Sequence, residues 1–458
     1  MYQGNASPKG EKIKIMDHQN AYSKPVTLKN ILRFAIPTIA MSVFMSFYTM
    51  VDGLFVSNLI GTGALSAINL TAPVIQLVTA ISTMLATGGS AVIMKKMGEH
   101  KPEEAREDFT FLILVNVAVG LAMTILGYTL MGMIFGNMGL TPEVASYCTS
   151  YLGRYLLFTV PILLMNNFTL YMIASEKANL SFFCSVAGGV LNIVLDYVFI
   201  GILDMGIGGA AIATGLGYSV TAVTGLFVFG RKQSLLHFTR PVFHLKVLAD
   251  AATNGCSEMA TALVTGIITM MFNWTMLRYV GEDGIAAVTI IMYVLMFASS
   301  LYTGYSYGVA PMLSYYYGEQ NHEKLQRLVG TSLKVIAVIS LVTVAVSFVA
   351  TKPLVSIFAR PDNPVYGLAV TGNRICTLAL FFIGFNIFAS GMFTALSNGI
   401  VSAVLAFSRS FVFMLITMLV LPALLGINGI WLATPVAELM ALILSVAMFL
   451  KYRKRYHY

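Results

Sequence analysis

Residues 109–132 read FTFLILVNVAVGLAMTILGYTLMG, an uninterrupted stretch without a charged side chain. An α-helix needs about 20 mainly apolar residues to cross the roughly 30 Å hydrocarbon core of a bilayer. Inside that core every backbone N–H and C=O must be satisfied within the segment, as a helix does. The stretch therefore predicts a membrane-spanning helix, which we place at residues 107–132.

Comparable apolar stretches recur along almost the whole chain, separated by short polar or Gly/Pro-containing breaks. Hydrophobic residues make up 57% of the sequence and charged residues only 10%, whereas soluble domains carry about a quarter charged residues. We therefore expect an all-α integral membrane protein with twelve transmembrane helices. The predicted spans are 31–57, 69–94, 107–132, 145–173, 178–201, 207–229, 247–277, 284–312, 327–350, 366–392, 400–424 and 428–450.

The distribution of Lys and Arg predicts the orientation, because cytoplasmic loops retain an excess of positive charge. With both termini cytoplasmic, all but five of the 28 Lys and Arg residues fall on the cytoplasmic side, Arg409 among them. The five exceptions are Arg154, Arg278, Lys352, Arg360 and Arg374. We expect a multi-pass protein of the cell membrane without a cleavable signal. The net charge of +8 reflects this topology and predicts no nucleic-acid partner.

The sequence contains an internal repeat with a shift of 220 residues. Ile60-Gly61 meets Val280-Gly281, and Gly98-Glu99 meets Gly318-Glu319. Six spans per repeat is an even number, so the two pseudo-symmetric six-helix lobes are related by an axis along the membrane normal. We predict a cytoplasmic segment 1–30, a first lobe 31–229, a cytoplasmic linker 230–246, a second lobe 247–450 and a basic C-terminus 451–458. The linker is expected to be partly amphipathic helix.

Ionisable groups inside a membrane are costly and usually face a cavity, a partner or an ion path. Asp52 lies about 20 residues into the first predicted span and Asp196 about 16 residues into the fifth, which places both at similar depths on helices that run outward. Tyr48 and Asn192 each precede one of these acids by four residues and share its helix face. The two carboxylates are candidates to hold one proton or ion, and the alternative is that each only bonds a neighbouring helix.

Glu258 is a third intramembrane acid, about 11 residues into the seventh predicted span. By the 220-residue shift it matches Thr38, so the repeats share a scaffold but not their chemistry. Two interpretations stay open: contact with a cationic substrate or coupling ion, and a structural bond to another helix. Pro37 lies in the first span, where it favours a kink. A hinge that responds to protonation of Asp52 and a passive kink are both compatible with that position.

The stretch from Val51 to Gly61, followed by Ala64 to Ala67 and Pro73, resembles the first-loop signature of the multidrug and toxic compound extrusion (MATE) family. The stretches Leu191 to Asp196 and Gly209 to Thr214 resemble the same family. The resemblance implies two six-helix lobes around a central cleft, and an antiporter that expels organic, often cationic compounds in exchange for inward H+ or Na+.

The resemblance also implies a cation-coupling site in the first lobe and no cofactor other than the coupling ion. Glu258 fits one member of an acidic pair that some relatives use in the second lobe, but the tenth span supplies no acid for the other. The residues implied for the first-lobe site are Asp52, Asp196, Asn192, Thr214 and either Asn167 or Asn166, with Asp52, Asp196 and Asn192 as ligands if the ion is Na+.

Three other classes of protein compete with an ion-coupled transporter as interpretations of this sequence. An ATP-driven pump is disfavoured because the chain contains no Gly-Lys dipeptide and therefore no phosphate-binding loop. A flippase for lipid-linked oligosaccharides is the alternative, and it would be expected to line its cleft with cationic residues, whereas the predicted spans place no Lys or Arg clearly at mid-span. An enzyme is disfavoured because all six histidines lie in loops or termini. We expect a monomer in membrane lipid that acts on amphipathic small molecules.

Overall fold

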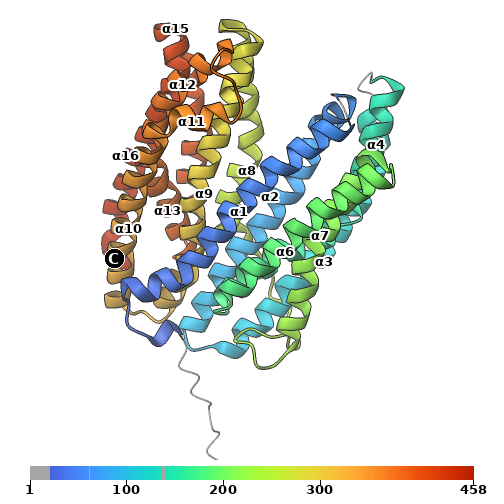
Figure 1. The fold of residues 1–458 in the computed structure, drawn as a ribbon. Coiled ribbons are helices and arrows are strands. Elements are labelled where there is room, and N and C mark those ends of the chain that lie inside the picture. The colour runs from blue at the N-terminus through green and yellow to red at the C-terminus, as the bar shows by residue number, and fades with distance from the viewer. Residues whose placement is uncertain (1–20, 61, 137–139) are drawn as a thin grey trace, which may run out of the picture.

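The computed structural model of the chain describes residues 21–60, 62–136 and 140–458, and leaves the side chains of residues 21 and 52–66 undescribed. All secondary structure in these ranges is helical (Figure 1). The first half comprises η1 (Ala21–Ser23), α1 (Leu28–Ile60), α2 (Thr62–Gly98), α3 (Pro102–Gly136), α4 (Pro142–Leu156), α5 (Thr159–Ala174), α6 (Ala178–Asp196), η2 (Tyr197–Ile202) and α7 (Gly206–Gly230). The second half comprises α8 (Leu245–Tyr279), α9 (Glu282–Gly318), α10 (His322–Val349), α11 (Thr351–Ser356), α12 (Pro364–Cys376), η3 (Thr377–Ala379), α13 (Leu380–Ala395), α14 (Gly399–Phe407), η4 (Ser408–Phe413), α15 (Met414–Leu425) and α16 (Ile427–Tyr456).

Among the described residues, 11 helical stretches are long and apolar enough to cross a membrane. Helices α4 and α5 form a twelfth span if they are counted together, although they are bent by 51°. At this bend the carbonyl of Leu156 accepts hydrogen bonds from the hydroxyls of Thr159, at 2.8 Å, and Thr124, at 2.9 Å, so that the break leaves this backbone group satisfied. The all-α membrane fold is confirmed, and the predicted twelve spans correspond to this count.

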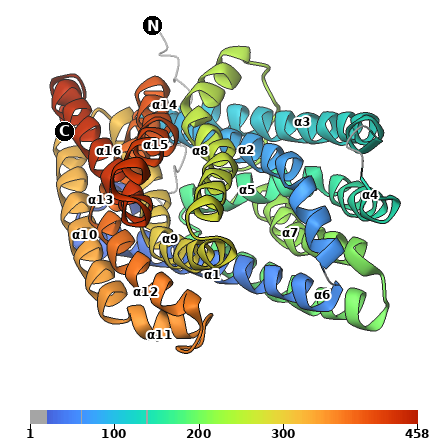
Figure 2. The ribbon, with the colours of Figure 1, turned by 90° about the horizontal axis from the view of Figure 1, so that it is seen from above.

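The helices form two bundles, α1 to α7 and α8 to α16, seen in Figure 1 from the side and in Figure 2 from above. The bundles meet through α1 and α2 of the first half and α8 and α9 of the second. From this junction they diverge toward the end of the molecule opposite the start of α1 and the end of α16 (Figure 1).

Glycines allow the two lobes to approach closely at the end where α2 and α9 finish. A Cβ atom added at Gly98 would overlap the carbonyl oxygen of Tyr315, and one added at Gly318 would overlap the carbonyl oxygen of Lys95. These two contacts are exchanged by the 220-residue shift, so they lie across the pseudo-two-fold axis. Small residues let helix backbones come into direct contact inside a membrane, and here they seal one end of the lobe junction.

The linker contains no helix: residues 231–236 form turns and bends, and residues 237–244 have no regular secondary structure. The expected amphipathic helix is therefore wrong. The Phe238 N–H donates to the carbonyl of Phe229 at 2.9 Å. The Phe238 ring stacks on the ring of Phe109, with the ring centroids 5.4 Å apart. The Thr239 N–H donates to the Thr110 hydroxyl at 3.0 Å. A helix would give up these contacts with α3 and α7, which anchor the linker to the first lobe.

Candidate ion and substrate sites

A buried polar cluster joins three helices of the first lobe. Asn192 and Asp196 on α6 are each 1% exposed, and they lie between Tyr48 on α1 and Thr214 on α7. The Asn192 side-chain amide is oriented so that both its nitrogen and its oxygen form hydrogen bonds. In this orientation the nitrogen donates to the Asp196 carboxylate at 3.1 Å and to the Tyr48 hydroxyl at 2.9 Å. Its oxygen then accepts from the Thr214 backbone N–H at 2.8 Å. The amide thus connects the carboxylate to both neighbouring helices.

The local sequence explains why this cluster forms where it does. Gly188 on α6 and Gly217 on α7 face each other's backbone, and each has no Cβ atom to hold the helices apart. Directly after Asp196 the helix widens into the π-helical turn η2. Such turns loosen the regular backbone ladder and are frequent at functional sites. Asp196 therefore lies at a junction where the helix backbone is able to rearrange.

The structure brings together four of the residues discussed from sequence: Asp196, Asn192, Thr214 and Tyr48. Asp52 belongs to the same helix as Tyr48, one turn further along α1, but its side chain lies outside the described residues. A shared site for Asp52 and Asp196 therefore stays a prediction.

The two asparagines of α5 contact other helices. The amides of Asn167 and Asn116 on α3 bond each other reciprocally, at 2.8 and 3.2 Å. Asn166 donates to the hydroxyl of Ser82 on α2 at 2.9 Å. These bonds connect α5 to its neighbours within the first lobe, and participation of either amide in ion coupling stays a prediction.

Pro37 lies at the junction between the lobes, inside a helix that continues on both sides of it. The neighbouring Thr38 hydroxyl donates to the carbonyl of Ala35 at 2.9 Å, which adds a hydrogen bond in the turn that the proline weakens. Across the junction, Gly304 and Gly308 of α9 lie directly against this part of α1. Any change of bend at Pro37 must therefore change the packing of one lobe on the other.

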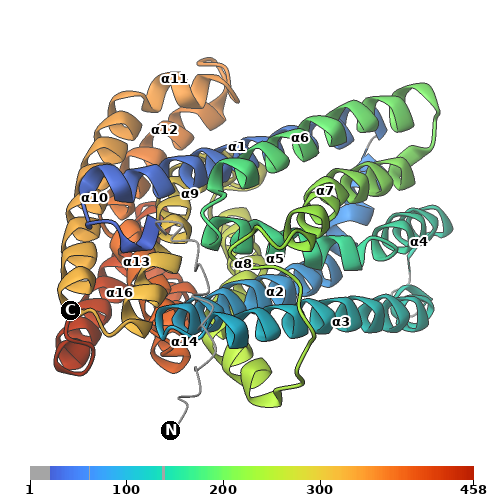
Figure 3. The ribbon, with the colours of Figure 1, turned by 90° about the horizontal axis from the view of Figure 1, so that it is seen from below.

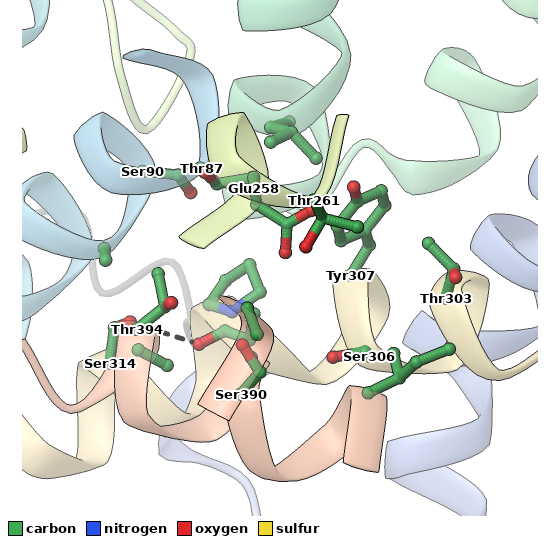
Figure 4. Close-up of a pocket in the computed structure, with 18 of the residues that line it drawn as sticks. Thr87, Ser90, Glu258, Thr261, Thr303, Ser306, Tyr307, Ser314, Ser390 and Thr394 are labelled. Atoms are coloured by element: carbon green, nitrogen blue, oxygen red, sulfur yellow. Dashed lines mark hydrogen bonds between the residues drawn. The ribbon is translucent and has the colours of Figure 1, made fainter. Parts of the chain in front are cut away.

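A cavity of about 250 Å³ lies between the lobes, with Glu258 of α8 in its wall. Its lining comes from α2 and α5 of the first lobe and from α8, α9, α13, α14 and η4 of the second. Figure 4 shows the Glu258 carboxylate pointing into the same space as Thr261 and Tyr307, with further hydroxyls from Ser90 and Ser390 around it. This arrangement offers one carboxylate and several neutral oxygen atoms to a bound molecule.

A second cavity of about 400 Å³ adjoins the first, and Thr303 and Tyr307 of α9 belong to both linings. It extends toward the first lobe and carries no ionisable acid or base among its lining residues except Tyr307. Methionine is flexible and polarizable and adapts to apolar groups of different shape. The methionines of this wall are Met41, Met45, Met165 and Met296.

A buried ion pair in the second lobe was missed from the sequence. Arg409, in η4, donates through Nε to both carboxylate oxygens of Glu438 on α16, at 2.9 and 3.1 Å. Asn386 of α13 donates to the same carboxylate at 2.8 Å and accepts from the Ser445 hydroxyl at 3.0 Å. Glu438 is only 6% exposed. The pair connects three helices of the second lobe.

This pair corrects two interpretations made from sequence. Arg409 was counted on the cytoplasmic side, but it lies inside the span Gly399–Leu425 and contributes to the lining of the Glu258 cavity. The statement that no Lys or Arg lies at mid-span is therefore wrong, and Glu438 is a further intramembrane acid. The signal was present, because each residue lies about ten positions inside its predicted span and opposite charges at one depth are expected to pair.

Two helical lobes that pack around a cavity with a carboxylate, and a separate buried polar cluster within one lobe, define a membrane transporter of the duplicated kind. The model of the family described as MatE matches residues 37–198 and 259–420, once in each lobe. The chain therefore belongs to the MATE family, and it is a transporter rather than an enzyme.

Relatives match over nearly the whole chain. The multidrug export protein MepA of Staphylococcus haemolyticus (strain JCSC1435) is 23% identical, over 93% of this chain and 94% of its own. MepA of Staphylococcus aureus (strain NCTC 8325 / PS 47) is 20% identical, over 95% of each chain. A crystal structure of MATE in complex with MaL6 has a TM-score of 0.89 and 25% identity, covering 95% of this chain and 98% of that one. A second solved structure is the outward-facing conformation of a multidrug resistance MATE family transporter of the MOP superfamily. It has a TM-score of 0.86 and 25% identity, covering 93% of this chain and 95% of that one.

Proposed function

We propose that this chain is a secondary active exporter of amphipathic organic cations, driven by inward flow of H+ or Na+. The observation that carries the proposal is the separation of two polar sites. The Asp196 and Asn192 cluster is buried within the first lobe, whereas the Glu258 cavity lies between the lobes. Membership of the MATE family and the multidrug export function named for its relatives support the same assignment.

The first-lobe cluster is the proposed coupling site. An ionised Asp196 accepts from the Asn192 amide, which also bonds Tyr48 of α1. A protonated Asp196 carries a donor of its own, and a bound Na+ would need carboxylate and carbonyl oxygen atoms turned toward it. Either event alters the bonds that connect α6 to α1. Because the residues around Pro37 on α1 pack against Gly304 and Gly308 of the second lobe, such a change is positioned to affect lobe contact.

The two adjoining central cavities are the proposed substrate site. The Glu258 carboxylate provides the counter-charge for an organic cation, and the methionine wall accommodates its apolar part. Arg409 also borders this space, but it is held by Glu438. One guanidinium between two carboxylates leaves the ionised region with an excess of negative charge, which favours a cation over an anion.

We propose that both termini are cytoplasmic, as the charge distribution predicts. The lobes diverge at the end away from the termini (Figure 1), so the structure corresponds in this orientation to an outward-facing state. Gly98 and Gly318 then seal the cytoplasmic end of the junction. Export requires this seal to open so that a substrate from the cytoplasm reaches Glu258.

A direct test is transport of a fluorescent organic cation in liposomes that contain the purified protein. An inward proton gradient and an inward sodium gradient are imposed in separate experiments, with Asp196→Asn as the uncoupled control. Dye movement driven by one gradient, and absent in Asp196→Asn, would support the proposal and identify the ion. Dye movement unaffected by either gradient would contradict ion coupling.

A flippase for lipid-linked oligosaccharides is the second candidate, because Arg409 does line the central cavity. A cationic cleft would need this guanidinium to be available, whereas it is bonded to Glu438 at 2.9 Å. The same liposomes discriminate the candidates when they contain a fluorescent lipid-linked oligosaccharide. The flippase would be favoured if the protein translocates that lipid, if Arg409→Met abolishes the translocation, and if the dye cation does not move.

A further inference from the structure

A crevice of about 680 Å³ lies at the end of the molecule where α1 begins and α16 ends. Figure 3 views the helices from that end. The crevice is bounded by α2 of the first lobe and by α8, α14 and α16 of the second. Its basic side chains come from both lobes: Lys95 and Lys96 of α2, Lys246 at the start of α8 and Arg455 at the end of α16. Lys96 is paired with Asp108 and Glu104, which lie outside the crevice lining. The crevice is separate from the central cavities and shares no lining residue with them.

Two of these four basic side chains have no ion-pair partner among the described residues. Among the described residues neither Lys246 nor Arg455 forms a salt bridge, and the Lys95 ammonium lies 3.8 Å from the Glu99 carboxylate on an exposed helix turn. Asp250 is the other acid in the lining. Like charges that face one cavity repel each other. An anion in the crevice would relieve this repulsion.

Ser397 supplies a polar group without a partner in the same crevice. It lies in the short loop between α13 and α14, and its hydroxyl oxygen is buried without a hydrogen bond in the described structure. Buried hydroxyls are nearly always bonded. This oxygen is closed to solvent in the structure, so a phosphate oxygen in the crevice would accept from the hydroxyl once the Ser397 side chain rotates toward it.

The internal repeat provides a comparison, because the equivalent crevice of the other half is largely filled by protein. Its lining includes Arg33, Phe34 and Ala178, and its volume is about 100 Å³. The fully buried Tyr22 packs beside it, with its ring 5.6 Å from Phe34 and its hydroxyl donating to the carbonyl of Ala174 at 2.6 Å. The repeat therefore builds two crevices, both with basic lining residues, and the one at Lys246 is the larger.

The chain before α8 does not supply a counterpart of Tyr22. The 220-residue shift matches Tyr22 to Val242, and the next residue, Phe243, contacts Phe111 of α3 with ring centroids 5.6 Å apart. It is nevertheless 75% exposed, and Leu245 beside it is 77% exposed. Ile400, which lines the crevice, is 70% exposed. Exposed apolar side chains next to Lys246 indicate that acyl chains, and not only water, reach this edge.

We propose that this crevice binds the phosphate of an anionic phospholipid headgroup, with Lys95, Lys246 and Arg455 as its counter-charges. The apolar edge favours a lipid over a soluble phosphate ester of the same chemistry. Basic pockets between membrane helices on the positively charged side are suited to such headgroups. Because Lys95 belongs to the first lobe and the other two residues to the second, the bound headgroup holds the lobes together at this end. This inference depends on neither the coupling ion nor the substrate proposed above.

Lipid binding is tested with the full chain in nanodiscs of phosphatidylcholine, with and without phosphatidylglycerol. Native mass spectrometry measures the phosphatidylglycerol that stays bound to the protein after the protein is released from the nanodisc. The crevice variant is Lys246→Gln with Arg455→Gln, and the matched control is Lys232→Gln with Lys454→Gln, which removes two exposed charges from the same end. We expect the wild type and the control to retain the lipid and the crevice variant to bind it roughly tenfold more weakly.

Equal retention of phosphatidylglycerol by the crevice variant and the control would overturn the proposal. Lys246→Gln alone serves if the double variant does not fold. Glycerol 3-phosphate, added to protein in pure phosphatidylcholine, tests the soluble source. Thermal stabilisation by glycerol 3-phosphate equal to that by phosphatidylglycerol would overturn the assignment to a lipid.

A second readout tests the bridging of the lobes. Spin labels at Glu103 and Glu323, exposed positions related by the repeat, report the separation of the lobes at this end. Phosphatidylglycerol should shorten the distance between the two spin labels in the wild type. It should have no such effect on the variant that carries Lys246→Gln and Arg455→Gln. An equal shift in both proteins would contradict bridging through these residues.

Discussion

Asn192 illustrates how one side chain makes a carboxylate sensitive to its neighbours. Its amide bonds Asp196, Tyr48 and the backbone of Thr214, which belong to three different helices. A buried carboxylate is expensive unless it is hydrogen-bonded or binds a cation. Any change in the charge of Asp196 must therefore be compensated within this small group, and α1 is one of the elements that has to respond.

Replacement of Asp196 by asparagine should abolish gradient-driven efflux, reducing it to the level of empty liposomes. The amide keeps the size of the side chain but carries no titratable proton and no charge for Na+, so folding should be preserved. Dye efflux under an imposed gradient measures the first effect, and gel filtration in detergent measures the second. Asp204→Asn, in an exposed loop, is the control. Full efflux by Asp196→Asn would remove the first-lobe site. Asp52→Asn is likewise expected to abolish gradient-driven efflux, and full efflux by that variant would also remove the site.

The Arg409 and Glu438 pair is expected to contribute to stability through mutual compensation. Removal of one partner leaves a buried charge alone, which costs roughly 3 kcal/mol or more, whereas replacing both with apolar residues is close to neutral. Arg409→Met should therefore lower the melting temperature in detergent more than Arg409→Met combined with Glu438→Met. A double variant that is less stable than the single one would show that the two residues do not act as a pair.

At the scale of elements, the contacts between helices depend on small residues at defined positions. Gly98 and Gly318 bring α2 and α9 together at one end of the lobe junction, and Gly304 and Gly308 bring α9 against α1. The positions 98 and 318 are related by the repeat. The closed end of the junction is therefore a symmetric structure that both halves of the chain encode.

Gly98→Ala should open this closed end, because the added methyl group would overlap the carbonyl oxygen of Tyr315. A cysteine introduced at Ser314 reports the opening when water-soluble thiol reagents are added from the side of the termini. We expect this cysteine to be labelled several-fold faster in the protein with Gly98→Ala than in the same protein with Gly98. Gly330→Ala is the control, since a Cβ atom there meets no neighbour within 4 Å. Unchanged labelling in Gly98→Ala would show that the junction tolerates a methyl group by local adjustment.

Pro37→Ala should slow transport more than it weakens substrate binding. The substitution restores a backbone N–H and straightens the helix. The neighbours of Pro37 on α1 contact the second lobe, and Pro37 lies outside the lining of the central cavities. Turnover of the dye cation and its binding to the detergent-solubilised protein are measured side by side. Turnover equal to that of the parent would leave Pro37 as a passive kink.

At the scale of the whole molecule, the central cavities exist only because the lobes meet. The first cavity takes Thr87 and Ser90 from the first lobe and Glu258 from the second. The adjoining cavity takes most of its methionines from the first lobe. The charged and apolar halves of the proposed substrate site thus come mainly from different lobes, so relative motion of the lobes necessarily rebuilds the site.

Glu258→Gln should change which compounds are exported. Without the carboxylate, monovalent organic cations should lose roughly tenfold or more in apparent affinity, since a charge-assisted contact contributes about 1.5–3 kcal/mol. A neutral compound of similar shape, tested in the same liposomes, should be much less affected because it depends on the apolar wall. An unchanged profile for both compounds would give Glu258 a structural role only.

The sequence by itself determined the membrane fold, the approximate course of the spans, the repeat and the family. Hydrophobicity is a local property of about 20 consecutive residues, and the depth of a residue follows from its position along a straight helix. For the same reason the sequence placed Asp196 and Asn192 on one helix face, and the structure shows them bonded to each other.

Lateral neighbours were decided by tertiary structure alone. The partners of Asn166 and Asn167, the pairing of Arg409 with Glu438 and the course of the linker all depend on which helices lie side by side. Length along the chain encodes depth in the bilayer, but it does not encode position within the membrane plane. That position follows from the packing of side chains and glycines far apart in sequence, and it created both the central cavities and the basic crevice.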